Sequence, residues 1–120
     1  MSDHAVLIAA ADASLRRALK TVLTTRLHMA VVGEACDGDE FYAAAAWLEP
    51  AFALLDWSLT GLCCDGDDDA CLARLAQTPV VVLTANEEQE AAALEAGAVA
   101  CFRKGAAPDR LIELIAKLQN

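Results

Sequence analysis

Short apolar runs alternate with helix-like segments along this chain, and that alternation limits its possible folds more than any other feature. The runs lie at residues 5–9, 29–36, 52–56, 80–84 and 99–102, and Gly33 predicts a break or bulge in the second of them. A short, unbroken apolar run bounded by turn residues is typical of a strand that is covered on both faces. Alternating strand and helix patterns favour one parallel sheet with right-handed crossovers and helices on both sides. We therefore expect an α/β fold with a doubly wound, five-stranded parallel sheet and five helices.

Apolar residues at helical spacing predict the helices between these strands. Asp12 or Ser14 can cap the first helix, and the opposite, solvent side of that helix is expected to carry Arg16, Arg17 and Lys20. Gly97 is expected to end the fourth helix, and Pro108 fits the first turn of the last. The predicted apolar faces, in chain order, are Leu15, Ala18, Leu19, Val22 and Leu23; Phe41, Ala44, Ala45 and Leu48; Cys71, Leu72 and Leu75; Leu94; and Leu111, Leu114, Ile115 and Leu118.

Composition and charge exclude several classes of protein. The chain has 120 residues, of which 57% are apolar, so we expect one compact domain over residues 1–120. A net charge of −9 argues against direct binding of nucleic acid, which requires clustered Lys and Arg. No apolar run approaches the roughly 20 residues that span a bilayer. Because Met1–His4 does not resemble the start of a secretion signal, we expect a cytoplasmic protein.

The five cysteines do not form a recognisable metal or disulfide pattern. Their number is odd and no Cys-x-x-Cys occurs, so we expect free thiols. Cys63 and Cys64 precede an acidic stretch, Asp65–Asp69, which resembles a calcium loop only superficially. Ala70 and Ala76 stand where such a loop needs Gly and Glu. A loop that leads into the third helix is the simpler interpretation.

Three polar residues stand at or just beyond the ends of three of these runs: Asp56, Thr84 and Lys104. Each has an ordinary explanation alone, as a turn aspartate, a helix cap and a solvated lysine. In a parallel sheet, however, all three would lie at the carboxyl edge, where such folds place their chemistry. A carboxylate nucleophile, a hydroxyl and an ammonium group suit phosphoryl transfer to the carboxylate. No glycine-rich nucleotide loop accompanies them.

Together these features resemble a response-regulator receiver domain, the phospho-accepting module of two-component signalling, over nearly the whole chain. The resemblance implies that Asp56 is the phosphorylated aspartate, that Thr84 closes on the phosphoryl group and that Lys104 is its ion-pair partner. The stretches that carry it are Val6–Ile8, Val31–Ala35 with Asp37–Gly38, Leu54–Asp56 with Gly61, Pro79–Ala85, Leu94–Ala98 and Lys104.

The chain departs from the receiver pattern at the metal site. Receivers normally carry two acidic residues after the first strand, which hold Mg²⁺, and Ala10 and Ala11 stand at those positions. By resemblance, Mg²⁺ would have Asp56, the backbone of Ser58 and, at best, the displaced Asp12 as ligands. Further departures are Thr60 and Gly105 in place of prolines, and Cys101 in place of the switch aromatic, with Phe102 one position later.

These departures lead to one main hypothesis and two alternatives. We expect a non-enzymatic, atypical receiver in which Mg²⁺ binding is weak or absent and phosphorylation of Asp56 is impaired. The first alternative is a working phospho-receiver that completes its metal site with Asp12 or solvent. The second is a small flavodoxin-like ligand-binding protein, disfavoured by the missing phosphate loop.

The resemblance also implies the partners. We expect a sensor histidine kinase or another signalling protein, and a homodimer is compatible with the family. By analogy, the contact surface would include Glu87–Ala96, Cys101 and Leu111–Leu118.

Overall fold

The computed structural model describes residues 5–59 and 78–119, and in these ranges strands and helices alternate as expected. The third expected helix, around Cys71–Leu75, and the acidic stretch after Cys63 and Cys64 lie outside the described residues, as does Met1–His4. The described elements are β1 (Ala5–Ala9), α1 (Ala13–Arg26), β2 (Ala30–Ala35), α2 (Gly38–Leu48), β3 (Phe52–Asp56), β4 (Val80–Thr84), α3 (Glu87–Ala96), β5 (Ala100–Arg103) and α4 (Pro108–Gln119).

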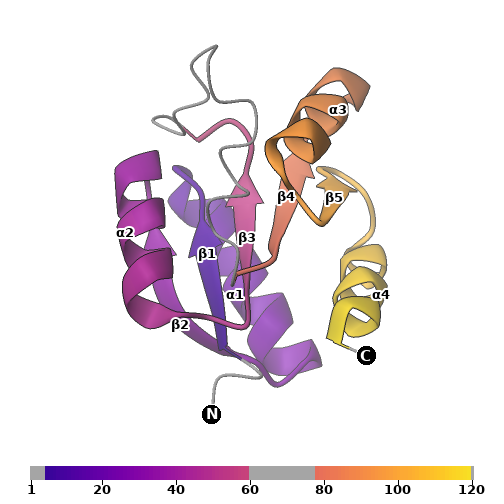
Figure 1. Ribbon diagram of the computed structural model, residues 1–120. Coiled ribbons are helices and arrows are strands. Elements are labelled where there is room, and N and C mark those ends of the chain that lie inside the picture. Colours follow the sequence, from indigo (N-terminus) through magenta and orange to yellow (C-terminus); the bar gives the residue numbers. More distant parts are fainter. Residues whose placement is uncertain (1–4, 60–77, 120) are drawn as a thin grey trace.

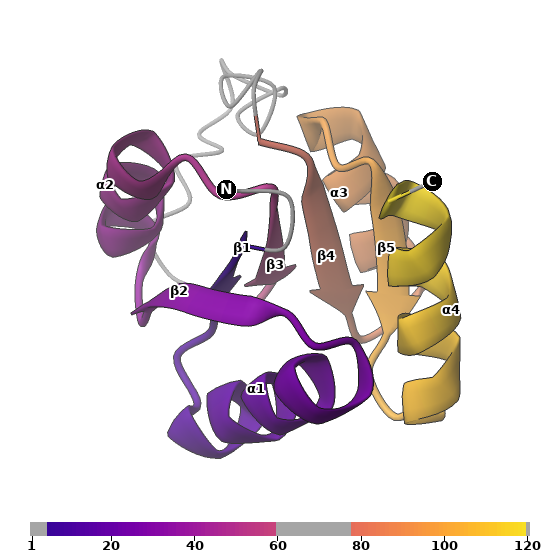
Figure 2. The ribbon, with the colours of Figure 1, turned by 90° about the horizontal axis from the view of Figure 1, so that it is seen from below.

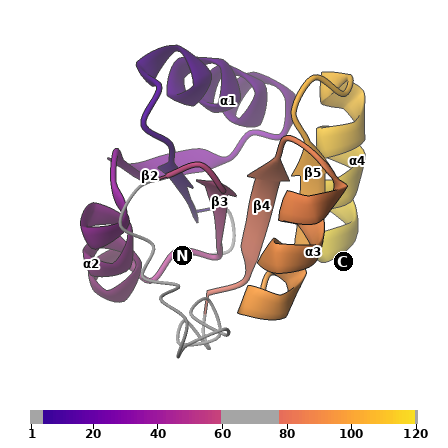
Figure 3. The ribbon, with the colours of Figure 1, turned by 90° about the horizontal axis from the view of Figure 1, so that it is seen from above.

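The strands form one parallel sheet in the order β2-β1-β3-β4-β5, which confirms the predicted doubly wound sheet (Figure 1). Helices α1 and α4 cover one face, and α2 and α3 cover the other (Figures 2 and 3). The central strands β1, β3 and β4 are buried along their whole length. Their continuous apolar sequence follows from this two-sided cover, because every side chain meets a helix layer.

Two apolar clusters, one on each side of the sheet, make up the core. Side chains alternate between them along each strand, so that Leu55 and Val82 face α2 and α3, whereas Leu54 and Leu83 face α1 and α4. The α1 side contains larger residues from its helices, including Leu19, Leu23, Leu111 and Ile115. The α3 contribution to the other side is limited to small residues, Ala93 and Ala96, with Ala98 just beyond the helix.

Polar caps set the helix starts. Asp12 is the N-cap of α1 and accepts a hydrogen bond from the Ser14 backbone, as predicted. The N-cap of α2 is Asp37, and that of α3 is Asn86. Thr84 therefore does not cap α3. Gly97 ends that helix in the left-handed conformation, at φ 116°, which confirms its predicted role.

Strand β2 contains the irregularity that the sequence predicts near Gly33. Val6 pairs with Val31 but Leu7 pairs with Gly33, so Val32 is an extra residue in β2. A Cβ atom on Gly33 would lie 2.6 Å from the Leu48 side chain of α2. Glycine is needed here because the strand approaches the helix closely.

The helices are short. None in the described ranges combines the length and apolar character needed to cross a bilayer.

Candidate functional site

The three residues singled out by the sequence lie at one edge of the sheet. Asp56 is the last residue of β3, Thr84 is the last of β4, and Lys104 directly follows β5. The strand register aligns these ends: Asp56 pairs with Leu83, and the Lys104 backbone N–H donates to the Thr84 carbonyl at 2.8 Å. Parallel topology thus gathers residues that are far apart along the chain, as expected for this class of fold.

Asp56 and Lys104 form a close ion pair. The Lys104 Nζ atom lies 2.6 Å from Asp56 Oδ1. That oxygen also accepts hydrogen bonds from the backbone N–H and the hydroxyl of Ser58, at 3.0 and 2.9 Å. Asp56 is 4% exposed, so this carboxylate is nearly removed from water. The turn after β3 therefore supplies two of its donors, and the loop after β5 supplies the third.

These donors keep Asp56 ionised. Burial by itself would raise its pKa, because water no longer solvates the charged form. The hydrogen bond from Lys104, the two bonds from Ser58 and the charge of Lys104 act in the opposite direction and outweigh burial. The pKa of Asp56 consequently lies below its ordinary value.

Thr84 shares the edge but does not join the pair. It is fully buried, and its hydroxyl has no hydrogen-bond partner among the described residues. Alternation along β4 places its side chain on the same face as Val82, toward α2 and α3. By the same alternation along β3, Asp56 lies on the same face as Leu54, toward α1. A buried hydroxyl without a partner is rare, and it leaves Thr84 with unused hydrogen-bonding capacity beside the site.

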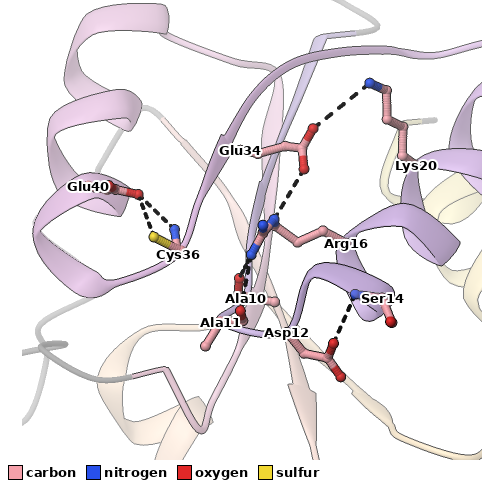
Figure 4. Close-up of polar contacts among 9 residues, drawn as sticks. All are labelled: Ala10, Ala11, Asp12, Ser14, Arg16, Lys20, Glu34, Cys36 and Glu40. Carbon is pink, nitrogen blue, oxygen red and sulfur yellow. Dashed lines mark hydrogen bonds and ion pairs between the residues drawn. The ribbon is translucent and has the colours of Figure 1, made fainter.

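The end of β1 carries alanine methyl groups and backbone carbonyls. Ala10 is fully buried and Ala11 is exposed. Arg16 of α1 folds back over this end, and its Nη1 donates to the carbonyls of Ala10 and Ala11 at 2.6 and 3.2 Å. Its Nε donates to Glu34 of β2 at 3.2 Å (Figure 4). A guanidinium group thus occupies the neighbourhood of the strand end in which receivers normally carry two carboxylates.

The prediction that Arg16 lies on the solvent side of the first helix was wrong. Its side chain is only 20% exposed, because three hydrogen bonds hold it against two strands. Helical periodicity assigns a face to the backbone position, but a long side chain can still return to the preceding loop. A usable signal was present: Glu34 is an acid in the otherwise apolar second strand, and a carboxylate at that position can attract a nearby guanidinium group.

A cavity of about 430 Å³ opens beside Asp56, on the α1 side of the sheet. Its polar members are Asp12, Asp56, Ser58 and Lys104. Its apolar wall comes from α1, β4 and β5, and the lining residues there are Leu15, Leu19, Leu83 and Phe102, with Gly105 completing the rim. Asp12, expected to sit outside the pocket unless the loop shifted, therefore does line it, although its carboxylate also caps α1.

This donor set does not suit a tightly held divalent ion. Magnesium prefers six oxygen ligands in octahedral geometry. From the part of the chain that the structure describes, two carboxylates line the cavity, and an oxygen of Asp56 is already bound by Lys104 and Ser58. The described residues contain one cluster of donors close enough for a metal, Cys36, Asp37 and Glu40, which lies between β2 and α2. There Glu40 bonds Cys36, and Asp37 caps α2.

Cys101, at the position of the receiver switch aromatic, and Phe102, one residue later, point to opposite faces. Cys101 packs against the cluster under α3, and burial raises the pKa of its thiol, with the charge of Glu90 acting in the same direction. Phe102 packs on the α1 side and lines the cavity. The aromatic ring has therefore moved to the face that carries Asp56.

Comparison with known proteins finds one family over most of the chain. The family described as "Response regulator receiver domain" matches residues 6–116. The curated relative "Uncharacterized transcriptional regulatory protein YxjL" of Bacillus subtilis is 31% identical over 121 residues, covering 96% of this chain. The chain spans 55% of the length of that relative.

Solved structures agree with the sequence comparison. The signal receiver domain of a response regulator from Bermanella marisrubri is 26% identical, with a TM-score of 0.77 and full coverage of both chains. The response regulator domain of Thermotoga maritima CheB is also 26% identical, with a TM-score of 0.78 and coverage of 97% and 96% of the two chains.

Proposed function

Since the chain belongs to the family of response regulator receiver domains, the signalling modules of two-component systems, we propose that it is an atypical member whose Mg²⁺-dependent phosphorylation at Asp56 is impaired. Asp56 holds the phospho-acceptor position, with Thr84 and Lys104 in the supporting positions. We further propose that the domain acts through protein contacts rather than as an enzyme, in the cytoplasm.

One observation carries the proposal: the acceptor carboxylate is neutralised by Lys104, whereas the end of β1 offers no acidic side chain. Divalent ions are held largely by charge, and a pair of unit charges at about 4 Å is worth roughly 4 kcal/mol at an effective dielectric of 20. Replacing two carboxylates by Ala10 and Ala11 therefore removes most of the attraction for Mg²⁺. Lys104 Nζ, 2.6 Å from Asp56 Oδ1, gives the acceptor carboxylate a counter-charge from the chain itself.

A second candidate function is a phospho-receiver that still works through a reduced metal site. The position of Asp12 favours this candidate, because Asp12 lines the cavity together with Asp56. Against it, the Asp12 carboxylate already accepts the Ser14 N–H as the cap of α1. Binding a metal through Asp12 would compete with that hydrogen bond and weaken the start of the helix.

Labelling with acetyl phosphate separates the two candidates. We expect little phosphorylation of Asp56, measured by intact mass after incubation with acetyl phosphate and Mg²⁺ over the time in which an ordinary receiver is labelled. Asp56→Asn is the negative control. Rapid, Mg²⁺-dependent addition of one phosphoryl group to the unmodified chain would overturn the proposal.

A gain-of-function variant supplies the matched control. In Ala10→Asp with Ala11→Asp, the two carboxylates return to the end of β1, so Mg²⁺ affinity and labelling should both rise. The single variant Asp12→Asn should leave labelling of the natural chain unchanged if Asp12 holds no metal. A large loss in that variant would favour the second candidate.

The partners follow from the family. Receiver domains interact with histidine kinases and effector domains, and we propose a sensor histidine kinase or another signalling protein as the partner here. A homodimer is a further proposal, for which α3, β5 and α4 form the candidate surface. Leu94 and Val99, which are 50% and 48% exposed, support the use of this face in a protein contact.

A further inference from the structure

We propose that the cavity beside Asp56 binds a small organic cation with an apolar body, such as an aromatic amine, in place of a metal ion. This inference rests on the proposed function, because it requires that Mg²⁺ does not hold the site.

The size and wall of the cavity indicate an organic ligand. Its volume of about 430 Å³ falls in the range of small-molecule sites, which are mostly apolar with a few convergent polar groups. Leu19 and Leu83 belong to the core, at 7% and 2% exposure, so this wall is fixed by packing. A hydrated magnesium ion would gain nothing from such a surface, whereas an apolar body would be removed from water.

The charges at the polar end favour a cation. Among the described residues, two carboxylates and one ammonium group line the cavity, so these groups together carry one negative charge in excess. Lys104 is committed to Asp56 at 2.6 Å, so Asp12 supplies that excess. An anionic ligand would face both carboxylates and would have to compete with Asp56 for Lys104. The chain as a whole carries a net charge of −9, which adds to the attraction for cations.

Phe102 adds an aromatic surface on the same cavity. Aromatic faces attract organic cations, and this attraction contributes about 0.5–2 kcal/mol according to how far the site excludes water. Because the ring packs against the α1-side core, it is held in place before any ligand arrives. A carboxylate, an aromatic ring and apolar walls on one cavity together describe a site for an ammonium group attached to a hydrocarbon.

The test is a titration of the ¹⁵N-labelled domain with benzylamine, followed by two-dimensional NMR. We expect saturable shifts centred on the residues that line the cavity. Three compounds separate the contributions of the ligand's charge and its apolar ring. Benzyl alcohol lacks the charge, phenylacetate carries the opposite charge, and methylammonium lacks the ring. Each should bind at least about tenfold more weakly than benzylamine. Equal binding of benzyl alcohol, tighter binding of phenylacetate, or shifts centred elsewhere would overturn the proposal.

Two variants and a control locate the binding energy. Asp12→Asn keeps the cap of α1, because Asn caps as well as Asp, but removes the charge. It should weaken benzylamine about fivefold. Phe102→Leu keeps apolar volume but removes the ring and should also weaken it about fivefold. Asp39→Asn, an equal charge change in the first turn of α2, should leave affinity unchanged. If Asp12→Asn and Phe102→Leu bind benzylamine as tightly as the control Asp39→Asn, the assigned site is refuted.

Magnesium in the same titration separates this inference from the proposed function. Displacement of benzylamine by Mg²⁺ at micromolar concentration would show an effective metal site, and both proposals would fail. If neither Mg²⁺ nor benzylamine shifts the lining residues, the proposed function stands and only the organic ligand is refuted.

Discussion

Arg16 joins three parts of the molecule through a single side chain. From its place in α1 it donates hydrogen bonds to the carbonyls of Ala10 and Ala11, just after β1, and to the carboxylate of Glu34 in β2. We expect Arg16→Ala to lower the free energy of unfolding by about 1–2 kcal/mol, because hydrogen bonds to a charged group are lost at a site that is mostly buried. Urea denaturation measures this. Arg17→Ala changes an exposed neighbour and should have an effect below about 0.5 kcal/mol; equal losses in the two variants would contradict the role assigned to Arg16.

Asp56 should make stability depend on pH in the acidic range. Its pKa is lower in the folded chain than in the unfolded one, so its contribution is complete above the ordinary aspartate pKa of about 4 and is lost as pH falls through the lower folded value. Asp56→Asn removes that contribution and leaves Lys104 without its carboxylate, which should cost about 1–3 kcal/mol at pH 7.

Urea denaturation between pH 7 and pH 3 checks this expectation. The difference in unfolding free energy between the natural chain and Asp56→Asn should shrink steadily below about pH 4. A difference that stays constant over the whole range would show that Asp56 is not ionised more readily in the folded state.

Sequence reasoning at the residue scale succeeded where a backbone rule determined the outcome. Asp12 and Gly97 take the predicted cap positions, and strand order brings Asp56 to Lys104. The direction in which a side chain points was harder to predict from the sequence. Whether Arg16 returns to the strand end, and which face Thr84 joins, depends on packing between elements far apart in the chain. The roles of these residues in phosphorylation remain predictions.

Among the elements, α3 is attached to the sheet in an unusual way. Its buried residues are Ala93 and Ala96, while its one large apolar side chain, Leu94, is 50% exposed. Small residues let the helix approach the sheet closely but bury little apolar area. This helix, which is part of the candidate contact surface, is therefore held weakly by its own side chains.

In α3, a substitution at a small buried alanine should therefore lower the free energy of unfolding more than truncation of the large exposed leucine. Ala93→Leu would force a larger side chain into a closed contact and should cost about 1–3 kcal/mol. Leu94→Ala should cost less than about 0.5 kcal/mol, because little of that side chain is buried. Urea denaturation of both variants measures this order. A larger loss for Leu94→Ala would show that the exposed leucine already packs against a partner, such as a second copy of the chain.

The element pattern was the most predictable level of this structure. Each strand in the described ranges was expected from its apolar run, and the break in β2 was expected from Gly33. The reason is physical: strands covered on both faces leave a continuous apolar signal. The cavity wall could not be foreseen in the same way, because Leu15, Leu83 and Phe102 meet only after the sheet has formed.

For the whole molecule, stability should be nearly independent of magnesium. A ligand that binds only the folded state stabilises it by RT ln(1 + [L]/Kd), which is about 0.4 kcal/mol when the concentration equals Kd. With a weak or absent metal site, 10 mM Mg²⁺ should therefore raise the melting temperature, relative to EDTA, by less than about 2 °C.

Differential scanning calorimetry measures this shift, and the variant with Ala10→Asp and Ala11→Asp is its positive control. That variant should be less stable than the natural chain in EDTA, because a buried carboxylate replaces Ala10, and should regain stability with Mg²⁺. A strong magnesium response in the natural chain would contradict the metal-independent site.

The extra residue in β2 also bears on how this protein behaves at high concentration. β2 and β5 are the two outermost strands of the sheet, and such strands can recruit strands from other molecules into continuous aggregates. Val32 interrupts the regular spacing of hydrogen-bonding groups along one border, and β5 is only four residues long at the other. Both borders are thus poor templates for intermolecular strand pairing, which protects a chain so rich in apolar residues from aggregation.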